Sequence, residues 1–71
     1  MKTTRYWIGT IGSVDDLGVP IGDTFIDGAT THGPWAIMSL ETFRKIGRGL
    51  GQGMGQKYVK QPDGKWLKVA G

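Results

Sequence analysis

The chain is only 71 residues long and contains no cysteine, and this combination sets the strongest limit on how it can fold. Small domains often depend on disulfides, or on a metal held by thiolates, to supplement a small core. Because neither is available here, the fold has to rest on buried apolar side chains. Hydrophobic residues make up 38% of the sequence, which is enough for one small core and a single domain spanning residues 1–71.

The distribution of apolar residues argues against a membrane protein. The longest purely apolar run is the four residues 35–38, which is far too short to cross a bilayer. Residues 1–11 lack the apolar region of a secretory signal peptide. We therefore expect a soluble, cytoplasmic protein that has no membrane partner.

Thirteen glycines and three prolines divide the chain into short segments. Residues 5–11 are rich in aromatic and β-branched side chains and predict an N-terminal strand. Residues 12–22 predict a turn region. Residues 23–27 and 34–38 predict two strands of a hairpin, joined by a glycine- and threonine-containing loop.

One helix is predicted after this hairpin. Ser39 is a good N-cap, and Glu41 suits the positive end of a helix dipole. Met38 and Phe43 have the spacing of a hydrophobic staple around such a start. Gly47 is typical of the residue that ends a helix, so we expect a short helix between Ser39 and Gly47.

The C-terminal segment predicts a second hairpin, with Pro-Asp-Gly at residues 62–64 between two alternating stretches. Proline and aspartate favour a type I turn, and glycine suits the left-handed bulge position after it. This turn would place Lys60 opposite Trp66 and Tyr58 opposite Lys68. The predicted fold is therefore α+β: an N-terminal strand, a knuckle-like turn, a β-hairpin, one short helix, a glycine-rich loop and a C-terminal β-hairpin.

The turn at residues 14–18 and the helix start at residues 39–42 share a spacing. In each, two positions three apart would become a Cys-x2-Cys pair if both were cysteine. This order resembles a treble-clef or zinc-ribbon module, in which a knuckle and a helix N-terminus hold one zinc ion. The chain also resembles small phage or bacterial proteins of unassigned function, on Asp-Gly-Ala-Thr at residues 27–30, Gly-Pro-Trp-Ala at 33–36 and the glycine-rich stretch 49–58.

The resemblance implies a metal-free descendant of a zinc module, because all four ligand positions lack cysteine. On this interpretation Val14 and Leu17 fill the former metal cavity, Ser39 has become an ordinary N-cap, and Thr42 holds the fourth position. The alternative is that Val14 and Leu17 are loop residues that pack on any nearby apolar surface. Neither interpretation implies a metal or a cofactor.

Glycines occupy every odd position from 47 to 55. This even spacing matches neither the dinucleotide-binding fingerprint nor the phosphate-binding P-loop, and the segment follows a helix where those motifs precede one. Its amides could instead hold an anion beside Arg48. Alternatively the glycines let the chain lie flat against another backbone or an aromatic ring, which is the interpretation we prefer.

Charge is distributed unevenly along the chain. Residues 1–36 hold two basic and four acidic side chains, a balance of −2, whereas residues 37–71 hold seven basic and two acidic side chains, a balance of +5. A basic half is typical of proteins that bind a polyanion, although lysines also serve solubility alone. On the C-terminal hairpin, aromatic and lysine side chains alternate on one face, whereas Val59, Leu67 and Val69 are expected on the other.

Interleaved rings and lysines favour single-stranded nucleic acid, because rings stack on bases while ammonium groups meet phosphates. The alternative is that the rings face the core and the lysine stems pack around them. The candidate nucleic-acid-binding residues are Arg44, Lys45, Arg48, Tyr58, Lys60, Trp66 and Lys68.

Catalytic residue types are scarce. The one histidine, His32, has no partners at the spacing of a catalytic triad, and the chain has no asparagine for a His-Asn-His nuclease. We therefore expect a non-enzymatic binding module without metal or cofactor. A nucleic-acid partner is slightly favoured. The alternative is an interaction or inhibitory module that binds a host or phage protein through Trp35, Leu50 and Met54.

Overall fold

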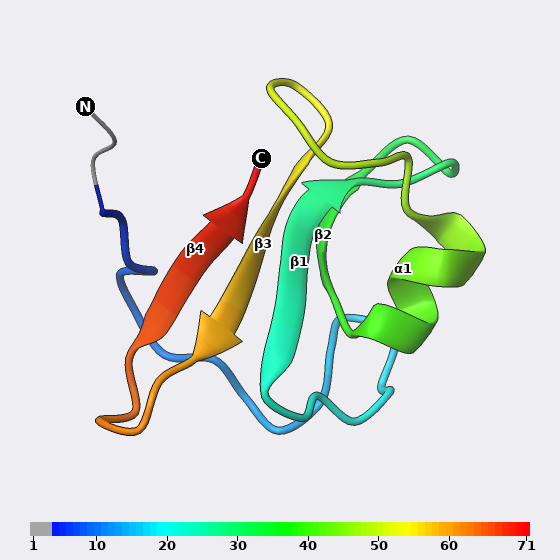
Figure 1. The fold of residues 1–71 in the computed structure, drawn as a ribbon. Coiled ribbons are helices and arrows are strands. Elements are labelled where there is room, and N and C mark those ends of the chain that lie inside the picture. The colour runs from blue at the N-terminus through cyan, green and yellow to red at the C-terminus, as the bar shows by residue number, and fades with distance from the viewer. Residues whose placement is uncertain (1–3) are drawn as a thin grey trace.

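The computed structural model describes residues 4–71, which form a four-stranded antiparallel sheet and one helix (Figure 1). The helix follows the second strand, and the strand order in the sheet is β2-β1-β3-β4. The α+β prediction, the two hairpins and the single short helix are confirmed. The elements are β1 (Thr24–Ala29), β2 (Trp35–Met38), α1 (Leu40–Ile46), β3 (Gly55–Lys60) and β4 (Trp66–Ala70).

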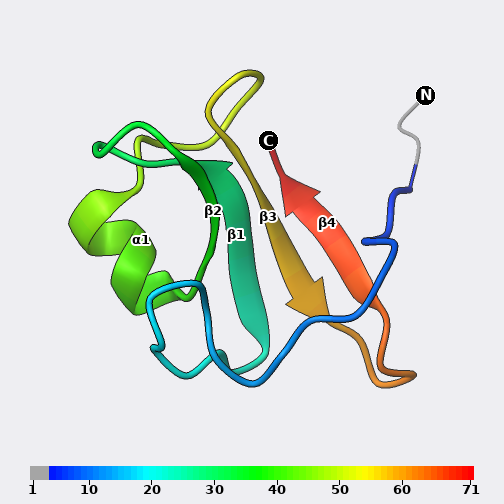
Figure 2. The same ribbon diagram turned by 180° about the vertical axis from the view of Figure 1, so that it is seen from behind.

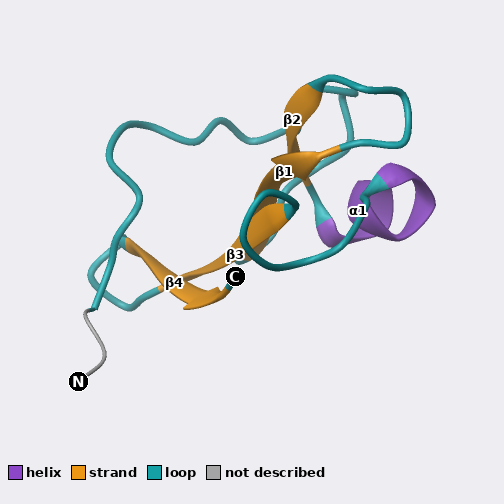
Figure 3. Ribbon diagram, turned by 90° about the horizontal axis from the view of Figure 1, so that it is seen from above, coloured by secondary structure: helices purple, strands orange, loops and turns teal. Residues whose placement is uncertain are grey.

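The sheet has two faces that are covered in different ways. Ile26 pairs with Met38 of β2 and lies on the face covered by α1, which we call the helix face. Phe25 pairs with Tyr58 of β3 and lies on the opposite face, which we call the aromatic face. Figure 3 shows α1 on one side of the sheet and the N-terminal segment on the other. Within residues 4–71, the buried apolar side chains are Phe25, Ile26 and Met38, so the core extends to both faces.

Local signals determine the start of α1, whereas packing determines its end. The Ser39 hydroxyl accepts a hydrogen bond from the Thr42 amide at 3.1 Å, as expected of an N-cap. Gly47 ends the helix but has φ −72°, not the left-handed conformation expected of a C-terminal glycine. A Cβ at this position would collide with the ring of Phe43. Glycine is therefore required here by close contact and not by a special dihedral angle.

The glycine-rich loop brings backbones close together. A Cβ on Gly55 would lie 2.8 Å from the carbonyl oxygen of Gly49, and one on Gly28 would lie 2.9 Å from the Gly55 Cα. Close approach therefore explains Gly55, whereas Gly49, Gly51 and Gly53 take φ values of +141°, +128° and +79°, which suit glycine for a different reason. The amides of Arg48 and Gly51 already donate to the backbone carbonyls of Ala29 and Gly55, so they are not free to hold an anion.

The N-terminal strand predicted at residues 5–11 is wrong. The Trp7 amide donates to the Trp66 carbonyl at 2.9 Å, and the Lys68 amide donates to the Arg5 carbonyl at 2.8 Å, so only residues 5–7 pair with the outer edge of β4. Gly9 then takes φ +118°, which only glycine adopts readily, and the extended pairing ends. The chain crosses the aromatic face near the turn between β3 and β4 (Figure 2). We call residues 5–22 the strap.

The far end of the strap pairs with β2 at the other edge of the sheet. The Asp16 amide donates to the Ile37 carbonyl at 3.1 Å, and the Asp16 carboxylate accepts from the Ile37 amide at 2.8 Å. A bridge between Val14 and Pro20 closes the turn before the chain enters β1. The strap therefore occupies both open edges of the sheet, which would otherwise expose unpaired backbone groups.

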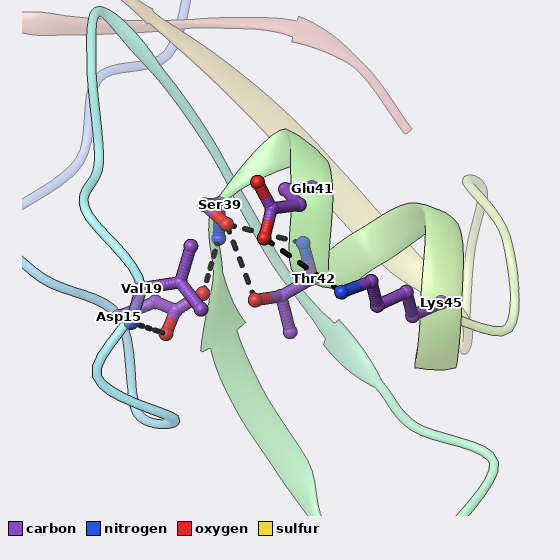
Figure 4. A network of polar contacts seen from close by, with 6 residues as sticks. All are labelled: Asp15, Val19, Ser39, Glu41, Thr42 and Lys45. Carbon is purple, nitrogen blue, oxygen red and sulfur yellow. Dashed lines mark hydrogen bonds and ion pairs between the residues drawn. The ribbon is translucent and has the colours of Figure 1, made fainter.

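Asp15 links this turn to the start of α1 (Figure 4). Its side chain is 5% exposed, and its two oxygens accept hydrogen bonds at 2.9 Å from the amides of Leu17, Val19 and Ser39. Burial alone would raise the pKa of Asp15, but the hydrogen bonds from Ser39, Thr42, Val19 and Leu17 outweigh burial and hold the pKa well below its ordinary range.

The expectation that Val14 and Leu17 fill an interior cavity is therefore wrong. They are 49% and 61% exposed, and Asp15, one of the two residues between them, is buried instead. The physical reason is that three amides at this junction need an acceptor, which a carboxylate provides and an aliphatic side chain does not. The turn and the helix start do lie together, through Asp15 and Ser39. A treble-clef relationship stays a prediction.

Candidate nucleic-acid interface

An aromatic cluster forms the floor of the aromatic face. Phe25 stacks on Tyr58 with ring centroids 5.0 Å apart and an interplanar angle of 13°. Trp7, from the strap, meets Phe25 and Tyr58 edge-on at 5.3 and 5.5 Å, and Trp66 meets Phe25 edge-on at 4.9 Å. Such pairs contribute about 0.5–1.5 kcal/mol each beyond the area they bury. The cluster therefore anchors the strap and holds Tyr58 and Trp66 in fixed orientations.

The C-terminal hairpin has the predicted register. Lys60 lies opposite Trp66 and Tyr58 opposite Lys68, and Gly64 takes φ +88° in the turn. The Lys60 ammonium nitrogen lies 5.8 Å from the centroid of the Trp66 ring, within the range of a cation–π contact. All four side chains consequently share the aromatic face.

Val69 departs from the predicted pattern. The register shifts between Lys57 and Tyr58, which pair with Ala70 and Lys68 and leave Val69 in a bulge. Its side chain is 49% exposed and does not extend the apolar stripe of Val59 and Leu67. An extra residue on one strand changes the alternation locally, which the sequence pattern does not reveal.

Two hollows lie on the aromatic face, at different levels of the hairpin. The first, which we call the arginine hollow, has a volume of about 500 Å³ and reaches the Tyr58–Lys68 pair. The second, which we call the strap hollow, has a volume of about 520 Å³ and reaches the Lys60–Trp66 pair. The arginine hollow is lined by Arg5, Tyr6, Ile8, Gln56, Tyr58 and Lys68. The strap hollow is lined by residues 9–13, 21–22, 60, 64 and 66.

The arginine hollow is positively charged and carries a hydroxyl donor. Arg5 and Lys68 both line it, and the hydrogen bond from the Lys68 amide to the Arg5 carbonyl keeps the two residues adjacent. Burial raises the pKa of Tyr58, the Asp27 carboxylate raises it further, and Arg5 partly opposes the increase. Tyr58 therefore stays protonated at neutral pH and can donate its hydroxyl proton to an anion.

Asp27 is an acidic neighbour of this charged surface. It lies on the aromatic face of β1, and its carboxylate accepts a hydrogen bond from the Trp35 indole at 2.6 Å. Among Arg5, Asp27, Lys60 and Lys68, three of the four charged groups are basic.

The structure does not bring all seven predicted binding residues together. Tyr58, Lys60, Trp66 and Lys68 share the aromatic face. Arg44 and Lys45 lie in the last turn of α1, which covers the helix face; Lys45 also pairs with Glu41 at 3.7 Å. Arg48 follows the helix and is exposed. The basic half of the sequence thus forms two separate surfaces.

Sequence reasoning missed Arg5 and Trp7. Both belong to the acidic half of the chain, so a charge balance summed over halves hides Arg5. Their alternation with Tyr6 is the signal that places them on one side of an extended segment beside β4. The rings of Tyr58 and Trp66 are half-buried. Both interpretations left open for them therefore hold in part: each ring packs in the cluster and also lines a hollow.

An apolar hollow of about 350 Å³ lies at the outer edge of the sheet, away from the hairpin. Trp35 and Leu17 line it and are 48% and 61% exposed. Leu50 and Met54, which were expected to share a surface with Trp35, are exposed at 36% and 40% but do not line this hollow. The remaining lining residues are Asp16, Thr30, His32, Pro34, Ala36 and Ile46.

Comparison of the chain with protein-family models, with curated proteins and with solved structures found no match. Within residues 4–71, no helix is long and apolar enough to cross a membrane. The same residues contain no group of three or more histidine or acidic side chains arranged to hold a metal ion.

Proposed function

We propose that the protein is a non-enzymatic module that binds single-stranded nucleic acid through its aromatic face. The observation that carries this proposal is the gathering of Arg5, Lys60 and Lys68 with Tyr58 and Trp66 around two hollows on one face. Cations that alternate with aromatic rings suit a strand whose phosphates and bases alternate.

The shape of the face favours a single strand over a duplex. The rings are half-buried and sit in hollows beside the strap, so a ligand has to insert individual groups to reach them. A flexible strand can turn its bases outward, whereas a duplex keeps them stacked inside. A duplex would meet only the cations at the rim.

The basic surface of α1 has a smaller role in this proposal. Arg44, Lys45 and Arg48 carry charge but have no aromatic partner, and Lys45 is paired with Glu41. They add to the long-range attraction of a polyanion and make no specific contact. This division predicts that removing the same number of charges from the two surfaces lowers the affinity for a single strand by unequal amounts.

Fluorescence anisotropy with a labelled single-stranded oligonucleotide of about 12 nucleotides tests the proposal. For three phosphate contacts, log K should fall with log salt with a slope of about −2. The Lys60→Gln/Lys68→Gln double variant should weaken binding about tenfold at low salt and flatten the slope by about 1.4.

The matched control is Arg44→Gln/Lys45→Gln, which removes the same charge from the helix. It should weaken binding less than threefold, by about 0.6 kcal/mol or less. Equal losses in the two double variants would show that only net charge matters. Absence of binding to single strands at low salt would overturn the proposed function.

A protein partner is the second candidate, favoured by the apolar hollow. Half-exposed Trp35 and Leu17 line it, and aromatic anchors in such hollows often dominate protein interfaces. A partner that survives nuclease treatment, and is lost with Trp35→Ala but kept with Lys60→Gln/Lys68→Gln, would support this function. Loss in both variants would assign the partner to the aromatic face instead.

A further inference from the structure

We infer that the strap hollow is a pocket for a single nucleobase, in which Trp66 supplies the stacking surface and the strap backbone supplies the hydrogen bonds. This inference rests on the proposed function and makes it more specific. It assigns different chemistry to the two hollows of the aromatic face: a base in the strap hollow and a phosphate in the arginine hollow.

The first observation is the unpaired backbone of the strap. No backbone hydrogen bond joins residues 8–12 to any other residue in the described part of the chain, 4–71. None of the five is proline, so each offers one N–H and one C=O group. Residues 9–12 line the strap hollow. The hollow therefore has a wall of donors and acceptors that neither the sheet nor the helix uses.

The second observation is the aromatic part of the same lining. Trp66 is half-buried, and its contacts with Phe25 and Lys60 keep its ring in place. Gly22 and Gly64 line the hollow without side chains and leave room for a planar group. A hollow lined by both an aromatic ring and free backbone hydrogen-bonding groups fits a flat ligand with polar edges, which describes a nucleobase.

The third observation is the indole of Trp7. Its nitrogen is the one buried side-chain nitrogen or oxygen in residues 4–71 that lacks a hydrogen-bond partner. A Cβ built on Gly9 would lie 3.6 Å from this nitrogen, and Gly9 lines the strap hollow. An unpaired buried donor costs about 1–3 kcal/mol. A small displacement of Gly9 would present this donor to a base in the hollow.

The arginine hollow has the complementary chemistry. Arg5 and Lys68 supply two cations, and Tyr58 supplies a hydroxyl donor, which suits a phosphate group. Lys60 is the one charged residue that lines the strap hollow, where it contacts the face of Trp66. One nucleotide laid along the hairpin could place its phosphate in one hollow and a base in the other.

The direct test compares two probes that share a phosphate but differ in the base: adenosine 5′-monophosphate and ribose 5-phosphate. Amide resonances of the 15N-labelled protein are followed during each titration. Both probes should shift the Arg5 and Lys68 amides. Adenosine monophosphate alone should also shift the amides of residues 9–12 and the Trp66 indole. The same shifts with both probes, or none at residues 9–12, would overturn the base pocket.

A steric variant tests the same pocket. Gly22 lines the hollow, has an ordinary φ, and a Cβ built there meets no atom within 4 Å. Gly22→Leu should fill the hollow and leave the fold intact, as judged by dispersion of the remaining amide resonances. It should weaken adenosine monophosphate binding about tenfold, as the loss of one stacked base does, and leave ribose 5-phosphate unaffected. Leu17→Ala, on the apolar hollow, is the control and should change neither.

The failure of this inference differs from failure of the proposed function. One outcome is that oligonucleotides bind with the expected salt slope while the Gly22→Leu variant binds adenosine monophosphate as tightly as the unmodified protein. That result would overturn the base pocket and leave the proposed binding of nucleic acid by the aromatic face supported. If adenosine monophosphate occupies the strap hollow but no oligonucleotide binds, the pocket stands as a nucleotide site and the proposed function falls. If none of the probes binds, both are overturned.

Discussion

The two faces of the sheet differ in how their coverings satisfy backbone polar groups. On the helix face, α1 covers β1 and β2, and Ile26 and Met38 are buried beneath this regular element. The aromatic face is crossed by the strap, in which residues 8–12 make no backbone hydrogen bond with another described residue. An irregular covering leaves hollows and free polar groups. The proposed nucleic-acid surface therefore lies on the face that the irregular strap covers.

The strap stays in place because its ends are attached, although its middle is not. Residues 5–7 pair with β4, Trp7 packs in the aromatic cluster, and Asp16 pairs with β2. Asp15 adds a buried carboxylate at the start of α1. This single side chain connects the covering of one face to the covering of the other. Its replacement should therefore disturb both coverings at once.

Asp15→Ala should produce the largest change in stability. Three amides would lose a charged acceptor, and a hydrogen bond to a charged group contributes about 1.5–3 kcal/mol. We expect the free energy of unfolding in urea to fall by about 3 kcal/mol or more. Asp23→Ala is the control, because that exposed carboxylate accepts only from neighbouring Thr24, and it should cost less than about 0.5 kcal/mol. Equal effects would mean that Asp15 does not hold the junction.

The Asp15 carboxylate should also make the free energy of unfolding depend on pH. The pKa of Asp15 is lower in the folded chain than in the unfolded chain, so the unfolded state binds more protons below about pH 4. Stability from Asp15 is complete above the unfolded pKa and is lost as the pH falls, by up to about 1.4 kcal/mol per pH unit. Urea unfolding between about pH 6 and pH 2 measures this slope. Asp15→Asn should flatten it, and an unchanged slope would assign acid sensitivity to other carboxylates.

The C-terminal hairpin and the start of the helix were predictable because short local sequences determine them. Pro62, Asp63 and Gly64 determine a turn by themselves, so the sequence predicts the hairpin down to the Lys60–Trp66 pair. The N-cap at Ser39 is equally local. The strap was not predictable in this way, because residues 5–11 have strand-forming side chains but pair only as far as Trp7. Whether they continue depends on the position of the β4 edge and on Gly9.

The candidate site was likewise predictable only where its residues belong to one local element. Alternation within one hairpin predicts that Tyr58, Lys60, Trp66 and Lys68 share a face. The contribution of Arg5 requires knowing that the strap lies beside β4, which is a contact between opposite ends of the chain. Charge summed along the sequence likewise grouped Arg44, Lys45 and Arg48 with the hairpin, although α1 carries the first two over the other face. Periodicity predicts neighbours within an element, and topology determines neighbours between elements.

A pair of glycine substitutions should show the difference in packing between the two coverings. Gly47→Ala would place a methyl group against the Phe43 ring on the helix face and should destabilise the protein by about 2 kcal/mol. Gly22→Ala on the strap meets no atom within 4 Å and should be neutral or stabilise by up to about 1 kcal/mol. Thermal unfolding of both variants measures the contrast. A cost at Gly22 as large as that at Gly47 would show that the strap is packed as tightly as the helix.

The smallest expected effect concerns Arg5, which ties the strap to the binding proposal. Arg5→Gln removes one cation from the arginine hollow but leaves its backbone bond to Lys68 intact, so stability should change by less than about 0.5 kcal/mol. Oligonucleotide binding should weaken about threefold at low salt, and the salt slope should flatten by about 0.7, the share of one phosphate. Arg48→Gln removes the same charge beyond α1 and should leave the slope unchanged. If Arg48→Gln flattens the slope and Arg5→Gln does not, the strand follows the helix side, and the face with the irregular covering is not the binding face.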